Sequence, residues 1–235
     1  MGPSHDTDQT GVFRAARDRV LSAVAEACER AGRDPSDVTL VAVSKTVSVE
    51  RLRSAVSAGL TLFGENRVQE AEAKIAALPG ARWHLIGPLQ SNKARRAVEV
   101  FDVVESVDSL DLARRLDRIA GELGRAPLGV FLQVNVDRDD AKAGFPPEAL
   151  QRELGQLAEM PNLELLGLMT VGRLAATAED ARPTFAHLRE LSRGLRAQSA
   201  RLGAGLSMGM TADYAVAVEE GATLIRVGRA LFGER

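Results

Sequence analysis

Eight short apolar runs, each followed by a segment with helical periodicity, most strongly restrict how this chain can fold. They are near-continuous apolar runs, which is typical of parallel strands buried on both faces. One strand and one helix together take roughly 24 residues, near the lower limit for a closed (β/α)8 barrel. The pattern predicts an α/β fold, a single (β/α)8 TIM barrel, with strands at 38–43, 60–63, 83–86, 103–107, 128–136, 163–169, 206–208 and 222–227.

An additional helix is expected before the first strand. Apolar residues recur at helical spacing from Gly11 onwards, and Gly32 occupies the position of a helix C-cap. We therefore expect residues 1–10 to be a disordered N-terminus and residues 11–235 to form one barrel domain. An open doubly wound sheet is the alternative, but its phosphate-binding glycines would follow the first strand, where this chain has residues 44–47, Ser-Lys-Thr-Val.

The composition restricts the class of partner. Thirty basic residues against 32 acidic ones give a net charge of −2, so there is no electrostatic reason to expect a nucleic acid or a membrane surface. Cys28 is the single cysteine, which excludes an internal disulfide. No apolar stretch is long enough to cross a bilayer and no signal peptide is apparent, so we expect a cytoplasmic protein. Charged outward helix faces favour a monomer.

Function in such barrels resides where the strands end, so the residues after each apolar run are the candidates. A lysine there, Lys45, is by residue type alone more often solvated or ion-paired than functional. Gly209 and Gly228 stand where barrels build phosphate sites, although both also suit ordinary tight turns. An amine and a phosphate cradle on one rim would match a phosphorylated aldehyde held as a Schiff base. The other candidates by position are Asn66, Gly87, Pro88, Ser106, Asn135, Thr170, Ser207, Arg226 and Arg229.

Six motifs, in order along residues 38–233, resemble the pyridoxal phosphate homeostasis protein family. They are VAVSKT at 41–46, FGENRVQE at 63–70, WHLIGPLQSNK at 83–93, GLMT at 167–170, LSMGM at 206–210 and RVGRALFG at 226–233. This family is similar in fold to the barrel domain of alanine racemase, binds pyridoxal 5′-phosphate (PLP) and has no firmly established reaction of its own. The resemblance implies the same cofactor for this chain.

The resemblance also implies a role for eight residues. Many relatives carry a small hydroxyl residue where this chain has Arg229, so Arg229 either replaces that donor by its charge or turns outward. Without the resemblance, a lone strand histidine such as His84 would be interpreted as a core group, and we expect no metal site. The implied roles are the Schiff-base lysine (Lys45), neighbours of the cofactor ring (Asn66, His84), the partner of the pyridine nitrogen (Arg226) and the phosphate site (Ser207, Gly209, Gly228, Arg229).

These roles predict a protein that binds, buffers and delivers PLP, with PLP-dependent apoenzymes as candidate recipients. Burial beside Arg226 is expected to disfavour the charged form of Lys45, and an arginine at the pyridine nitrogen would make carbanion chemistry weak. The single tyrosine, Tyr214, is placed by the pattern in a helix capped by Thr211, with a structural role. The alternatives are a low-activity PLP-dependent amino-acid racemase, a Schiff-base aldolase or other sugar-phosphate enzyme, and a purely structural interaction module.

Overall fold

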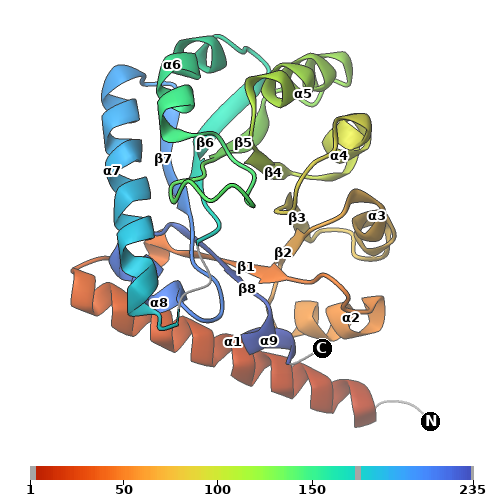
Figure 1. The fold of residues 1–235 in the computed structure, drawn as a ribbon. Helices are drawn as coiled ribbons and strands as arrows, with labels where there is room; N and C mark the ends of the chain where they lie inside the picture. Colours follow the sequence, from red (N-terminus) through yellow and green to blue (C-terminus); the bar gives the residue numbers. More distant parts are fainter. Residues whose placement is uncertain (1–3, 173–175, 234–235) are drawn as a thin grey trace.

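The computed structural model describes residues 4–172 and 176–233, which form a closed barrel of eight parallel strands in sequence order (Figure 1). Pairing of the first strand with the eighth closes the barrel, so the single (β/α)8 prediction is confirmed and the open-sheet alternative is wrong. The strands are β1 (Thr39–Val43), β2 (Leu62–Glu65), β3 (Arg82–Leu85), β4 (Val103–Val107), β5 (Leu128–Gln133), β6 (Leu163–Met169), β7 (Leu202–Ser207) and β8 (Leu224–Val227).

Helices surround the barrel, and the additional N-terminal helix crosses one side of it against α2, α8 and α9 (Figure 1). Three short 3-10 turns, η1 (Pro35–Asp37), η2 (Ser91–Lys93) and η3 (Glu179–Ala181), lie between the longer elements. The helices are α1 (Ser4–Ala31), α2 (Val49–Ser57), α3 (Val68–Ala77), α4 (Ala94–Val100), α5 (Leu110–Glu122), α6 (Pro147–Ala158), α7 (Arg182–Gln198), α8 (Tyr214–Glu219) and α9 (Arg229–Phe232).

Helix α1 is longer than the sequence pattern indicates. It begins at Ser4 rather than Gly11, so residues 4–10 are helical where we expected disorder, while residues 1–3 lie outside the described residues. Its apolar stripe is buried, and the ring of Phe13 packs edge-on against Phe232 of α9 with centroids 5.5 Å apart. Each large side chain buried in this way contributes roughly 1.5–3 kcal/mol, which holds α1 against the barrel.

Several element boundaries differ from the prediction by two to four residues, among them the end of β5 and the start of β8, and two near the C-terminus are informative. Strand β7 begins at Leu202, four residues before the predicted strand. Its first half contains glycines in place of large apolar residues, so the apolar pattern did not reveal it. A Cβ atom on Gly205 would lie 2.6 Å from the Leu166 carbonyl oxygen, so this close approach of β6 and β7 requires glycine. Helix α8 starts at Tyr214 with Asp213 as its N-cap, and not at Thr211.

Apolar side chains fill part of the barrel interior. Val103, Phe131 and Met169 form a buried cluster against Leu166 and Leu224. These residues come from β4, β5, β6 and β8, as expected when inward-facing residues of several strands pack in a layer. The interior is therefore a packed core, and polar groups inside it need partners of their own.

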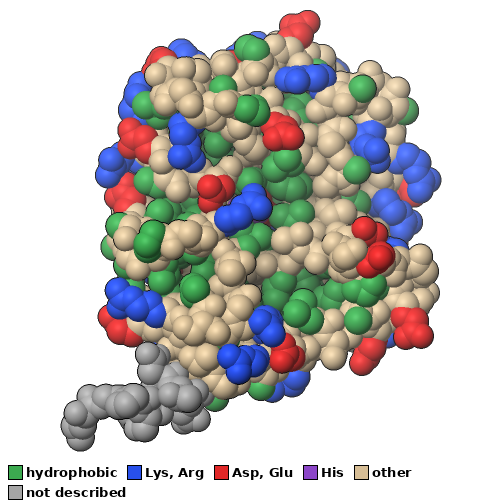
Figure 2. All heavy atoms as spheres, turned by 180° about the vertical axis from the view of Figure 1, so that it is seen from behind, with side chains coloured by type: hydrophobic (Ala, Val, Ile, Leu, Met, Phe, Trp, Pro, Cys, Tyr) green, Lys and Arg blue, Asp and Glu red, His purple; other side chains and the backbone are tan. Residues whose placement is uncertain are grey.

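The outer surface carries mixed charge. On the face seen from behind in Figure 2, basic and acidic side chains are interspersed and no single sign covers it. Within the ranges 4–172 and 176–233, no helix has the length and apolar character needed to cross a membrane.

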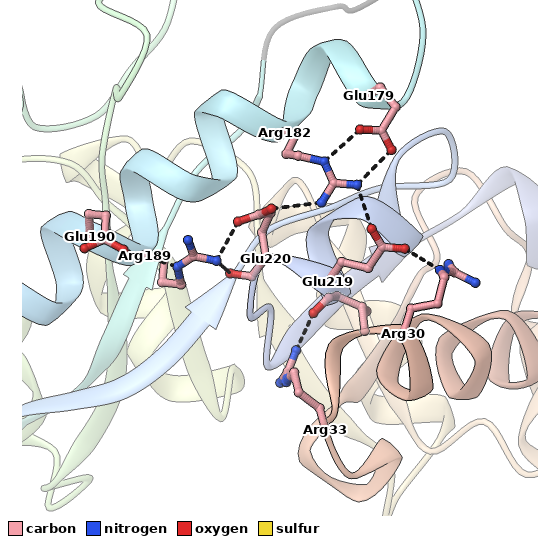
Figure 3. Close-up of polar contacts among 9 residues, drawn as sticks. Arg30, Arg33, Glu179, Arg182, Arg189, Glu190, Glu219 and Glu220 are labelled. Carbon is pink, nitrogen blue, oxygen red and sulfur yellow. Dashed lines mark hydrogen bonds and ion pairs between the residues drawn. The ribbon is translucent and has the colours of Figure 1, made fainter.

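An ion-pair network joins α1, α7 and α8 at the side of the barrel (Figure 3). Arg182 lies at its centre and contacts Glu179 (2.7 Å), Glu219 (2.6 Å) and Glu220 (2.8 Å). Arg30 in the last turn of α1 binds the other oxygen of Glu219 at 2.7 Å. Because the ends of three helices share these charges, the network is expected to stabilise their packing more than an isolated surface pair would.

Replacing the central arginine should weaken this packing. We expect Arg182→Met to lower the free energy of unfolding by roughly 1–2 kcal/mol in chemical denaturation, whereas Arg193→Met, which removes an exposed pair with Glu190, should change it by less than about 0.5 kcal/mol. The hydrogen bond from Arg182 lowers the pKa of Glu219, so the stabilisation is present above the ordinary carboxyl pKa and is lost as pH falls through the lowered one. Equal effects of the two substitutions would show that the network adds nothing.

Candidate functional site

One buried carboxylate, that of Glu105, joins four strands inside the barrel. The Nδ1 atom of His84 lies 2.6 Å from Glu105 Oε1, and the Ser207 hydroxyl donates to Oε2 at 2.5 Å. Arg226 Nη1 is 3.9 Å from the same Oε2 atom. Side chains from β3, β4, β7 and β8 thus meet at one acidic group, which we call the Glu105 network.

Arg226 is held in the interior by several partners. Its Nη1 donates to the Ser207 hydroxyl at 2.5 Å and its Nη2 to the Thr170 carbonyl at 2.7 Å. Burial lowers the pKa of Arg226, and the negative charges of Glu105 and Asp213 oppose that shift. An arginine pKa starts so high that the guanidinium remains charged.

Glu105 is the counter-charge of this arginine. Burial alone would raise the pKa of Glu105, but the hydrogen bond and charge of His84, with Arg226 and the Ser207 hydroxyl, hold it below the ordinary value. The carboxylate is therefore ionised in the folded protein. A buried charge pair of this kind is tolerated because hydrogen bonds satisfy its remaining lone pairs.

Lys45 lies in the turn just after β1 and is exposed, so our expectation that it is buried beside Arg226 is wrong. The physical reason is its distance along the chain: β1 pairs with its neighbours up to Val43, and Lys45 follows two residues later, at the barrel mouth. Within the described parts of the chain, no hydrogen bond or ion pair engages its amine. The next residue, Thr46, has a left-handed backbone with φ 64°.

The ends of β7 and β8 carry the candidate phosphate residues. Gly209 is buried with φ +92°, and a Cβ atom there would lie 2.5 Å from the Ala217 Cβ atom of α8, so only glycine fits. Its carbonyl accepts from the Arg226 N–H at 3.0 Å, which ties the two strand ends together. Gly228 is the N-cap of α9 and Arg229 is its first residue, exposed to solvent. The first N–H groups of a helix have no acceptor within it.

The structure connects some of the predicted residues and not others. Contacts of the Glu105 network join His84, Ser207 and Arg226, and a backbone hydrogen bond adds Gly209. The other four predicted residues show no hydrogen bond or ion pair to the Glu105 network within the described chain; they are Lys45, Asn66, Gly228 and Arg229. Asn66 is half-buried and follows β2.

Glu105 itself was missed by the sequence interpretation. It lies in the middle of an apolar run, Val103–Val107, in which every residue is buried. A charged residue inside a strand that is buried on both faces requires a partner, and that requirement was the available signal. The strands that provide the partners are far apart in the sequence, so only the folded barrel identifies them.

A second polar cluster, which we call the α3 cluster, lies between α3 and the ends of β1 and β2. The ammonium group of Lys74 contacts Glu65 (2.8 Å), Glu70 (2.9 Å) and the carbonyl oxygen of Ser44 (2.9 Å). Burial raises the pKa of Glu65, with Lys74 and the Ser44 hydroxyl opposing the shift. This cluster was also not predicted from the sequence. Among the residues that the structure describes, no group of three or more His, Cys, Asp or Glu is arranged to hold a metal ion.

Comparison with known proteins identifies relatives along almost the whole chain. The sequence family of the alanine racemase N-terminal domain matches residues 18–235 of this chain. A pyridoxal phosphate homeostasis protein of Synechocystis is 45% identical over 204 residues, covering 86% of this chain and 93% of the relative. A protein of the same name from Pseudomonas aeruginosa is 45% identical over 221 residues, covering 92% and 93% respectively.

Solved structures show the same relationship. PipY of Synechococcus elongatus PCC7942, solved with PLP bound, is 48% identical, with a TM-score of 0.80 over 89% of this chain and 100% of PipY. Alanine racemase of Clostridium difficile 630 is 15% identical, with a TM-score of 0.73 over 96% of this chain and 57% of the racemase, and this shows likeness of fold alone. The chain belongs to the pyridoxal phosphate homeostasis protein family, whose barrel is that of the alanine racemase N-terminal domain.

Proposed function

We propose that this protein binds PLP and takes part in PLP homeostasis by binding, buffering and delivering the cofactor, with Lys45 as its covalent anchor. The observation that carries the proposal is the register of β1 with β8, which places Val41 opposite Arg226. Arg226 points into the barrel, so its partner Val41 does too, and continuing the alternation of side chains from β1 into the turn would direct Lys45 to the same inner side, at the mouth above Arg226. Relatives that bear the name of PLP homeostasis proteins, and PipY with PLP bound, support the choice of cofactor.

The residues at this end of the barrel fit a phosphorylated pyridine. The Nε2 atom of His84 is buried and has no hydrogen-bond partner in the described structure. An unsatisfied buried polar atom costs roughly 1–3 kcal/mol, which a polar group of a ligand would offset. We assign the aldehyde to Lys45, and the ring to Asn66, His84 and Arg226.

The phosphate is assigned to the ends of β7 and β8. Gly209, Gly228 and Arg229 offer backbone N–H groups and a positive charge there. Ser207 also lies at this end of β7, but its hydroxyl already donates its hydrogen to Glu105, so it is less available to a phosphate than the other three residues. We also propose that the protein is a monomer that transfers PLP to PLP-dependent apoenzymes.

The charge of Arg226 favours a carrier over a racemase. Bound PLP supplies an electron-withdrawing ring, which is most effective when the pyridine nitrogen is protonated. A guanidinium ion held charged by Glu105 and Asp213 would oppose that protonation. Tyr214 packs against the hydrophobic core, where burial and the charge of Glu26 on α1 raise its pKa, so its environment does not favour a role as a base.

Reduction with borohydride should locate the anchor. The chain has four lysines, of which Lys74 and Lys142 already donate to protein oxygens. With PLP and borohydride, we expect the adduct on the peptide containing Lys45, and we expect Lys45→Ala to abolish the visible absorption band and that adduct. Lys93→Ala, which removes an amine of η2, should leave both unchanged. Adduct distributed over the other lysines would reject Lys45 as the anchor.

A carrier should not turn over amino acids. We expect the PLP-loaded protein to leave L-alanine and other amino acids unracemised when the mixture is analysed by chiral chromatography. Turnover that Lys45→Ala abolished would instead establish the racemase alternative.

The Glu105 network should contribute to stability in a pH-dependent way. Glu105→Gln removes the counter-charge of Arg226 and is expected to lower the free energy of unfolding by about 3 kcal/mol at pH 7. Because the folded pKa of Glu105 lies below the ordinary value, this difference is fully present above that value and shrinks as pH falls through the folded pKa. Denaturation of both proteins at pH 7 and at acidic pH measures it, with Glu99→Gln as the exposed control. A difference that stayed constant down to low pH would contradict the assignment.

A further inference from the structure

The α3 cluster holds the backbone on both sides of Lys45. The ammonium group of Lys74 donates to the carbonyl oxygen of Ser44 at 2.9 Å, and the N–H of Thr46 donates to the carboxylate of Glu70 at 2.5 Å. Glu70 and Lys74 are four residues apart on α3 and also contact each other at 2.9 Å. One face of one helix therefore fixes the peptide groups that precede and follow residue 45.

The cluster is built for a fixed geometry. The side chain of Lys74 is 7% exposed and that of Glu65 is fully buried, and their contact of 2.8 Å anchors the ammonium group from the β2 side. Burial would raise the pKa of Glu70, but the Thr46 N–H and Lys74 hold it below the ordinary value, so the acceptor is ionised. Hydrogen bonds to charged groups are stronger than those between neutral groups.

The backbone at this point is not in its most favourable conformation. The φ angle of 64° at Thr46 lies in the left-handed region, which is sterically unfavourable for a β-branched residue. Such a conformation persists where surrounding contacts determine it, and the contact from Glu70 is made to this very residue.

From this arrangement we propose that Glu70 and Lys74 are positioning residues for Lys45. The amine of Lys45 is exposed and forms no hydrogen bond or ion pair in the described ranges, so the start of its side chain is placed by the backbone alone. Holding residues 44 and 46 sets where the side chain leaves the barrel rim and reduces the ordering needed when a ligand is captured. The inference rests on the proposed function, since it concerns the same lysine.

The same contacts would also fasten α3 to the barrel without any role in binding, and α3 provides a matched control for that possibility. Glu72 lies on the same helix and forms an ion pair of 2.8 Å with Arg96 of α4. Glu72→Ala therefore removes a glutamate and its ion pair from α3 without touching the backbone beside Lys45.

The test compares Glu70→Ala, Glu70→Gln and Glu72→Ala with the native chain. Two quantities are measured: the dissociation constant for PLP by absorbance titration, and the hydrogen exchange of the Thr46 amide without PLP. We expect Glu70→Ala to weaken PLP binding about tenfold and to speed exchange about tenfold or more, the loss of one charge-assisted hydrogen bond. Glu70→Gln, which retains an acceptor oxygen, should fall between, and Glu72→Ala should stay within about twofold of the native chain.

Loss of the positioning role and loss of the proposed function would give different results. Equal PLP dissociation constants for folded Glu70→Ala and Glu72→Ala would overturn the positioning role, as would unchanged exchange at Thr46 in Glu70→Ala. If the native chain formed no adduct at Lys45, the proposed function would fail, while the exchange measurement would still decide whether Glu70 holds the backbone at Lys45.

Discussion

The buried carboxylate of Glu105 is the interaction on which the barrel interior depends. It receives hydrogen bonds from His84 and Ser207 and provides the negative charge nearest to Arg226 among the ion pairs of the described chain. An unpaired guanidinium inside a packed barrel would cost several kcal/mol, and Glu105 offsets that cost together with the hydrogen bonds that Arg226 donates to Ser207 and Thr170. Strands β3, β4, β7 and β8 are thereby linked through side chains as well as through their backbone ladder.

Two separate polar systems define the proposed site from opposite sides of β1. The Glu105 network fixes a guanidinium inside the barrel, and the α3 cluster fixes the backbone that carries the amine of Lys45. The described structure shows no contact between the two functional groups, and their relation is set by the pairing of β1 with β8. The site is therefore specified by backbone register and by buried carboxylates rather than by mutual contact of the groups proposed to bind the cofactor.

The sequence predicted what depends on local pattern. Near-continuous apolar runs at a regular spacing indicated the barrel, and a helical stripe indicated α1, because burial of strands and helices leaves a periodic pattern in the sequence. The start of β7 was missed because close strand contact at Gly205 is a tertiary requirement that removes the apolar signal. The partners of Glu105 and the exposure of Lys45 were beyond reach for a related reason, since both depend on how far each strand extends and on which strands face each other across the barrel.

The left-handed backbone of Thr46 has a consequence for how this chain can change. A glycine at residue 46 would relieve a steric cost on the order of 1–2 kcal/mol, yet it would also allow the turn after β1 to sample many conformations. Threonine restricts the turn, and α3 selects one of the conformations that remain. The turn beside Lys45 is thus an example of preorganisation: the backbone adopts a less favourable conformation, and in return the direction of the chain at residue 45 is already set before a ligand binds.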